Sequence, residues 1–317
     1  MKHYITLFFL FIACCCYAQN GDELLVYSVK GKVTAIYKNE ESQVKVGKVL
    51  KQGTTINTQR DAKLTMVCKQ GKPLCVTKEG MYPVSIWKDS CKMDNRSLTS
   101  SYFQYIWNEL YHRSNEYKEV AEKNNMAVVR GDGPYRIEVY PDNWVIVEFS
   151  PGLDTINYAS GSFLLSWTCY ECRGKFQFQL YTAKDRKLIF KDSIKGSEIS
   201  IDKFRKKLKP GVKYAWTITT NAKTGVIRRR IFNYVPKKTV TDYIESIKDD
   251  VDVPEDSAAQ YFRIAYLLEK KHYLADAYAW YKKAAMADPE SSLYQDKLNS
   301  FRFEYHLDVM ETKKEEN

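Results

Sequence analysis

The sequence predicts a multidomain protein that is mainly β over its first two thirds and α-helical towards its end. Apolar and polar residues alternate between short Gly turns in two regions, residues 24–88 and 135–235, and this period of two is typical of half-buried strands. In residues 97–124, and again from residue 240, apolar residues recur with a period near 3.6, which indicates amphipathic helices. A chain of 317 residues is long enough for two or three domains.

An apolar run at the N-terminus predicts a cleavable signal peptide over residues 1–18. Lys2 supplies a short positive start, residues 4–13 supply the apolar stretch, and residues 16–18 (CYA) place small side chains where a signal peptidase cuts. The run is too short to span a bilayer as a mature helix. We therefore expect cleavage before Gln19 and export of the chain.

A second interpretation of the same segment is a lipid anchor. Residues 11–14 (FIAC) loosely resemble a lipobox, which would make Cys14 the processing site and the lipid-carrying residue. Charges interrupt every later apolar run before it reaches the roughly 18 residues that a membrane span needs. The sequence thus predicts a protein of the periplasm or cell envelope that is soluble, or is held at the membrane only by a lipid on Cys14.

Residues 19–96 are predicted to form a small β domain, with the last of its short strands at residues 82–87. Glycines and aliphatic residues follow an order that runs through Gly31-Lys32-Val33, residues 46–50 (VGKVL), 53–58 (GTTINT), 62–66 (AKLTM) and a turn at Gly71. This order resembles the periplasmic FecR-type domain. The resemblance implies an extracytoplasmic β module that receives or relays binding, as in the ferric-citrate regulators. Those regulators also have a cytoplasmic segment and a transmembrane helix, which are not found here, so we do not expect sigma-factor control through the membrane.

Residues 97–130 are predicted to connect the two β regions, mainly as an amphipathic helix. Its apolar stripe consists of Phe103, Ile106, Leu110, Tyr117 and Val120. We expect this helix to bridge the two β regions and to cover an edge of one of them.

Residues 131–236 are predicted to form a β-sandwich of about seven strands. The segment 208–218 (LKPGVKYAWTI) resembles the turn and following strand of a fibronectin type III or immunoglobulin-like domain. That resemblance implies that Tyr214 anchors a corner and that Trp167 is the core tryptophan of the facing sheet. Such sandwiches mostly bind or space other modules.

Residues 237–310 are predicted to be helical, and residues 311–317 to be a charged tail. If Pro289 ends a pattern of about 34 residues, seven further residues fall at packing positions: Tyr261, Ile264, Ala265, Leu268, Ala277, Tyr281 and Ala284. This register resembles the tetratricopeptide repeat (TPR) family, whose helices bind peptides or neighbouring subunits in a concave face. One repeat seldom buries enough surface alone, so we expect helices at residues 240–248 and 291–306 to complete the bundle. An alternative is that this short stack only packs against the sandwich.

Five of the eight cysteines remain after the predicted cleavage, and export permits disulfides. Cys68 and Cys75 flank a predicted hairpin turn and are a candidate disulfide across two strands. Cys169 and Cys172 form a C-x-x-C motif between strand-like segments, which favours a turn or local disulfide over a redox or zinc site. The odd total means that at least one thiol is free or pairs elsewhere.

No catalytic, cofactor or metal site is predicted. His112, His272 and His306 are the histidines left after cleavage, and none lies in a nucleophile elbow or a zinc-binding motif. The net charge of +10 would suit an acidic partner, with local concentrations of basic residues at 203–209 and 228–230. Neither lies in a nucleic-acid motif, so nucleic acid is not an expected partner.

Together these features predict a non-enzymatic interaction or scaffold protein of the bacterial envelope. Its TPR-like helices, its β-domain surfaces or both would bind protein partners. One alternative is a ligand-sensing component of a signalling system that acts through the FecR-like domain. Another is a thiol-disulfide protein that uses Cys169 and Cys172.

Overall fold

A computed structural model of the protein describes residues 23–91, 98–116, 147–150, 153, 155–169, 174–219, 229–249, 253–305 and 307. The chain divides into two compact units, one made of residues 1–124 with 250–259 and the other of residues 125–249 with 260–317. Within the described ranges, no helix is both long and apolar enough to cross a membrane. The predicted signal peptide and charged tail lie outside the described residues.

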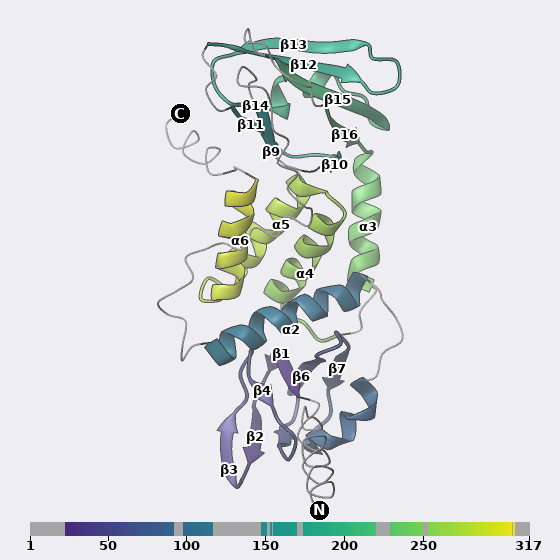
Figure 1. The fold of residues 1–317 in the computed structure, drawn as a ribbon. Helices are drawn as coiled ribbons and strands as arrows, with labels where there is room; N and C mark the ends of the chain where they lie inside the picture. Colours follow the sequence, from purple (N-terminus) through teal and green to yellow (C-terminus); the bar gives the residue numbers. More distant parts are fainter. Residues whose placement is uncertain are drawn as a thin grey trace, which may run out of the picture. The chain divides into compact units, whose positions relative to one another are not determined.

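In its described residues, the first unit has two antiparallel four-stranded sheets (Figure 1). One sheet has the order β4-β1-β6-β7, formed by Val49–Leu50, Leu24–Lys30, Lys63–Cys68 and Pro73–Val76. The other has the order β3-β2-β5-β8, formed by Glu40–Gln43, Val33–Tyr37, Thr55–Thr58 and Gly80–Pro83. The chain then turns into two 3₁₀ helices, Val84–Trp87 (η2) and Asp89–Cys91 (η3). The strand predicted at residues 82–87 is therefore wrong beyond Pro83, whose missing N–H group limits further pairing.

Alternating side chains of both sheets form one apolar core. Leu24 and Val26 of β1, Ile56 of β5 and Leu64 and Met66 of β6 are all almost completely buried in it. In β5, buried and partly exposed residues alternate, as inward and outward side chains of a strand do, whereas β1 and β6 are buried on both faces.

A helix, α2 (Leu98–Glu116), packs against β1 and β6. Phe103, Ile106 and Leu110 of the predicted stripe are buried, whereas Tyr117 and Val120 lie outside the described residues. The ring of Phe103 meets the ring of Tyr27 edge to face at 5.3 Å. Because β1 and β6 are the two central strands of their sheet, the helix covers a sheet face, and the expected cover of an edge is wrong.

A short segment from much later in the chain completes the first unit. The Tyr27 hydroxyl donates to Glu255 Oε1 at 2.9 Å, and Thr65 Oγ1 donates to the carbonyl oxygen of Pro254 at 3.0 Å. Residues 250–259 therefore belong to the first unit, although residues 125–249 belong to the second.

The second unit contains a β-sandwich with one sheet of three strands and one of five, counted over the described residues. The smaller sheet has the order β14-β11-β9, formed by Glu198–Ser200, Leu164–Cys169 and Val147–Ser150. The larger sheet has the order β10-β16-β15-β12-β13, formed by Thr155–Tyr158, Arg230–Tyr234, Val212–Thr219, Phe176–Thr182 and Leu188–Ile194. Only the β10–β16 pair among these is parallel. The chain crosses between the sheets from β11 to β12 and again from β13 to β14, as in Greek-key sandwiches.

A tyrosine fixes the corner before β15. The backbone N–H of Lys209 donates to the Tyr214 hydroxyl at 2.7 Å, which is the tyrosine corner of immunoglobulin-like and fibronectin-like sandwiches. Trp167 is buried in the opposite sheet, on β11. The second β region is thus an immunoglobulin-like or fibronectin type III-like sandwich, as the segment around Tyr214 indicated.

Four helices follow the sandwich: α3 (Lys237–Asp249), α4 (Ser257–Lys270), α5 (Leu274–Ala287) and α6 (Ser292–Glu304). Most of this helical region belongs to the same compact unit as the sandwich. The two parts join at the edge strand β10, where the Asn157 N–H donates to the His272 carbonyl oxygen at 2.9 Å. Asn157 Nδ2 also donates to the Lys271 carbonyl oxygen at 2.7 Å. The turn between α4 and α5 therefore covers an otherwise open sheet edge, which is one way that proteins protect such edges.

Candidate interaction surface

The pair formed by α4 and α5 has clear local start and stop signals. Asp256 caps α4, since its Oδ1 accepts from the Ala259 N–H at 2.8 Å, and Asp is among the preferred N-cap residues. The helix stops where His272 adopts a positive φ of 59°, a left-handed conformation that commonly ends helices. The tight turn that results lets α5 run back along α4.

The residues predicted to pack this pair are placed as follows. Ile264, Ala265, Leu268, Ala277, Tyr281 and Ala284 are each 0% exposed. Tyr261 is half-buried, and Pro289 is exposed between α5 and α6. The small alanines allow close approach of the helices, and Tyr281 fills space beside Phe262, with 5.5 Å between ring centroids.

A polar network, which the sequence reasoning missed, joins three of the helices. The Tyr281 hydroxyl of α5 donates to Glu269 Oε2 of α4 at 2.5 Å, and Lys297 Nζ of α6 lies 3.0 Å from the same oxygen. Burial, with the nearby Glu269 carboxylate, raises the pKa of Glu304 and the pKa of Tyr305. Glu269 therefore acts as a shared acceptor at the centre of the helical region.

A second missed contact fixes α3 to α4. Arg263 is only 1% exposed, and its Nη1 donates to the Ile247 carbonyl oxygen at 2.7 Å. A charged side chain this deep costs free energy unless it is hydrogen-bonded. Neither Arg263 nor Glu269 lies on a position that the repeat pattern singles out, which is why periodicity gave no signal for them.

The outer face of α5 is one exposed surface of the helical region. We name Ala279, Trp280, Lys283 and Met286 the α5 face, since they fall within one arc of the helix and are exposed or half-exposed. Met286 is 78% exposed. The Trp280 ring lies 5.4 Å from the Tyr261 ring, and Lys283 Nζ lies 4.1 Å from the Trp280 centroid. Tryptophan and tyrosine are enriched at binding hot spots, and methionine is enriched at interfaces.

The cysteines are paired differently from the hairpin prediction. Cys68 bonds to Cys91, with an S–S distance of 2.08 Å, so the candidate Cys68–Cys75 bridge is wrong. Strand register explains why: Cys75 lies opposite Thr65, three residues from Cys68. In addition, Cys75 is exposed, whereas Cys68 points into the core.

Cys169 ends the strand β11 and is disulfide-bonded. Cys172, its predicted neighbour in the motif, lies outside the described residues. A cysteine at the end of a sheet strand lacks the helix N-terminus that lowers thiol pKa values in redox motifs.

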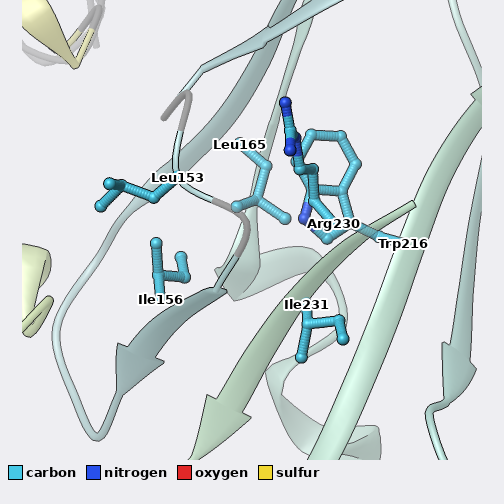
Figure 2. Close-up of a pocket in the computed structure, with 6 residues that line it drawn as sticks. All are labelled: Leu153, Ile156, Leu165, Trp216, Arg230 and Ile231. Carbon is cyan, nitrogen blue, oxygen red and sulfur yellow. The ribbon is translucent and has the colours of Figure 1, made fainter. Parts of the chain in front are cut away.

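A small hollow opens between the sheets of the sandwich (Figure 2). Its walls are the side chains of Leu153, Ile156, Leu165, Trp216, Arg230 and Ile231. The space among these side chains, open solvent included, is about 160 Å³. Over the described part of the chain, no cluster of three or more His, Cys, Asp or Glu side chains could hold a metal ion.

No protein family matches the chain, and a search of curated proteins finds no match. One solved structure to which it is similar is that of the fibronectin(III)-like modules of Clostridium thermocellum CbhA, at 10% identity. That match covers 69% of this chain and 88% of the other, with a TM-score of 0.22. Because the score is so low, the fibronectin-like assignment rests on the strand order and the Tyr214 corner.

Proposed function

We infer that this chain is a non-enzymatic interaction protein of the bacterial cell envelope, exported and active outside the cytoplasm. Its C-terminal helices, which resemble a tetratricopeptide repeat, would recruit a protein partner, and its FecR-like and fibronectin-like domains would bind or space. The observation that carries the proposal is the α5 face, where Met286 is exposed and Trp280 is half-exposed on a helix whose other side is packed.

The disulfides support the proposed compartment. Cys68 is bonded to Cys91, and Cys169 is also disulfide-bonded. Such bonds form and persist in oxidising compartments and are rare in the cytosol. They agree with the signal peptide that the first eighteen residues predict.

The partner should meet the α5 face through a small, mostly apolar contact. Trp280 is braced by Tyr261 on one side and by Lys283 on its ring, so its orientation is fixed before binding. Preorganised aromatic anchors lose little conformational entropy on association. An amphipathic helix or an extended segment of a partner protein, with an acidic residue to meet Lys283, would suit this surface.

Removal of the helices is a poor test, because their turn covers β10 and its loss would expose a sheet edge. Surface substitutions are sharper. We propose a double variant that combines Trp280→Ala and Met286→Glu. The control is Phe303→Glu, which alters an equally apolar side chain on α6 that is 64% exposed. All are exposed or half-exposed positions, so folding should survive in each.

The measurement is crosslinking of the exported chain to its neighbours in intact envelopes. The α5-face variant should lose the crosslinked partner, while Phe303→Glu should keep it. An unchanged set of crosslinked proteins, with the variant folded and exported at the normal level, would remove the recruiting role. Loss of the same partner in both variants would show that the contact is not specific to this face.

A further inference from the structure

The positive charge of the chain is concentrated in one stretch of the sandwich. Residues 184–213 contain eleven Lys or Arg and four Asp or Glu, which is a net charge of +7 against +10 for the whole chain. Apart from Arg205, every one of these basic residues is exposed. Arg205 is instead held by an ion pair with Asp202. We name the exposed Lys and Arg of residues 184–213 the basic edge.

The fold brings this stretch together around β13. The turn between β12 and β13 lies beside the start of β15, where the Ala183 N–H donates to the Lys213 carbonyl oxygen at 2.9 Å. The 3₁₀ segments Ile201–Lys203 (η4) and Arg205–Lys207 (η5) reach back to the same strand. Lys207 Nζ lies 5.1 Å from the Phe190 ring centroid, and Lys203 Nζ lies 3.7 Å from Asp192 Oδ2. The basic residues of this stretch therefore gather around β13, with Lys203 and Lys207 on the face of Phe190 and Asp192 and Lys191 on the other face of the strand.

Its position within the second unit leaves it accessible. In the five-stranded sheet, β10 and β13 are the two outer strands, as Figure 1 shows. The helical region covers the β10 edge through the contacts of Asn157. The basic edge is at the opposite side of the sheet, so it and the α5 face could be occupied at the same time.

Protection of a bare strand edge explains only part of this charge. Lysines on an edge strand prevent pairing with another sheet, and Lys191 on β13 fits that role. The lysines of η5 and of the β12–β13 turn do not lie on the strand, so edge protection does not require them. Their repulsion is an electrostatic cost that a negatively charged partner would relieve.

The character of the surface points to a lipid bilayer. Its charges are nearly all lysines, which act as point charges and are spread over a turn, a strand and a 3₁₀ segment, so a plane of headgroups matches them. Leu188, 48% exposed, lies among them at the start of β13. An apolar side chain within a basic surface favours a membrane interface, where it can enter the headgroup region. A soluble polyanion would gain nothing from it.

We propose that the basic edge docks the sandwich onto an anionic membrane surface of the envelope. Lys187, Lys191 and Lys206 would contact lipid headgroups and Leu188 would enter the interface. This inference uses the envelope location of the proposed function. It does not depend on the α5 face, and vesicle binding and crosslinking are separate measurements, so either can fail alone.

The test is sedimentation of the processed chain, from Gln19 onward, with vesicles of phosphatidylcholine alone or of equal parts phosphatidylcholine and phosphatidylglycerol. We expect binding to the anionic vesicles alone, and loss of that binding at high salt because screening shortens the electrostatic range. Each surface lysine contributes about fivefold to binding, so the triple variant Lys187→Gln, Lys191→Gln, Lys206→Gln should bind roughly a hundredfold more weakly. Leu188→Gln should weaken binding by a smaller factor.

A matched control removes the same charge elsewhere. The triple variant Lys45→Gln, Lys51→Gln, Lys63→Gln changes three exposed lysines of the first β domain and should retain binding within about threefold. Equal loss in both triple variants would reduce the effect to net charge and overturn the proposal. Equal binding to neutral vesicles would also overturn it. Binding of a soluble acidic polysaccharide as tight as that of vesicles, with no effect of Leu188→Gln, would assign the surface to an extended polyanion instead.

Discussion

The first β domain and the helical region are stabilised by different kinds of interaction, one covalent and the other non-covalent. In the β domain, the Cys68–Cys91 bond joins the end of β6 to the 3₁₀ turn after β8, within an otherwise apolar core. The helical region has no cysteine in its sequence. There, aromatic contacts of Phe262 and a shared carboxylate, Glu269, join three helices.

Because of this difference, we expect the stability of the two regions to respond differently to reductant, to changes of side-chain shape and to pH. A covalent bond that closes a loop acts mainly on the unfolded chain and depends on the redox state. Close packing acts on the folded state and depends on shape. Polar groups at the helical junction also make that region respond to pH. Each substitution below alters one of these contributions, beginning with the largest effect.

Loss of the Phe262 side chain should have the largest effect. Phe262 is fully buried and contacts the rings of Tyr281 and Tyr294, at 5.5 and 4.9 Å. We expect Phe262→Ala to lower the free energy of unfolding by about 3–5 kcal/mol, through lost burial and the cavity left behind. Hydrogen exchange should show the loss in α4, α5 and α6. Phe303→Ala is the matched control, and it should change stability by less than about 0.5 kcal/mol.

Loss of the Cys68–Cys91 disulfide should have the second-largest effect on stability, and this effect should be confined to the first β domain. The bond closes a loop across a sequence separation of 23 residues, and chain entropy predicts about 3 kcal/mol for a loop of that size. Cys91→Ser should lower stability by that amount and make the first unit insensitive to added reductant. Cys75→Ser should change stability by less than about 1 kcal/mol. A larger loss of stability in Cys75→Ser than in Cys91→Ser would instead support a Cys68–Cys75 bond, which the strand register argues against.

A glycine tests how closely α2 approaches the β6–β7 hairpin. Gly71 has a φ of +85°, and an added Cβ would collide with the Ser100 carbonyl oxygen of α2. Gly71→Ala should therefore cost about 2 kcal/mol, from backbone strain and displacement of the helix. Gly47→Ala is the control, because Gly47 has the same backbone conformation, a φ of +83°, with no atom within 4 Å of the added carbon. Equal stability losses, measured by denaturant unfolding, would show that the α2 contact does not matter.

The sequence predicted contacts that depend on local patterns. Alternation located most of the strands but not β3 or β10, and the period of the apolar residues located α2 to within a residue of its start at Leu98. The corner at Tyr214 was expected from the resemblance of residues 208–218 to fibronectin-like domains, and its bond to Lys209 spans only five residues. In the α4–α5 pair, the alanine positions came from the register of the tetratricopeptide resemblance, and these alanines are buried.

Contacts between distant segments could not be predicted in this way. The partner of Cys68 depends on strand register and on the side of the strand that Cys75 faces, neither of which its spacing determines. Glu255 meets Tyr27 across 228 positions, and nothing in either local sequence signals that contact. The α5 face was missed because exposed residues leave no periodic signal of their own.

The smallest effect is expected at the junction of the helices with the sandwich, and it depends on pH. Burial raises the pKa of Asp276 to about 6, despite a 3.5 Å hydrogen bond from Ser160 and the charge of Lys237. Its Oδ2 is buried without a hydrogen-bond partner. The folded state holds this proton more tightly than the unfolded state does. The contribution of Asp276 to the free energy of unfolding is therefore fully present below about pH 4. It is lost as pH rises through about 6.

Asp276→Asn should therefore raise the free energy of unfolding at pH 8 by about 1–2 kcal/mol, since a neutral amide avoids the cost of a buried charge. At pH 4 the variant and the parent chain should be equally stable. Denaturant unfolding across this pH range measures the difference. Ser160→Ala, which removes the hydrogen bond from Ser160 Oγ to Asp276 Oδ1, should shift stability in the opposite direction at pH 8. A variant equally stable to the parent at every pH would mean that water reaches the carboxylate and that the junction between sandwich and helices is open.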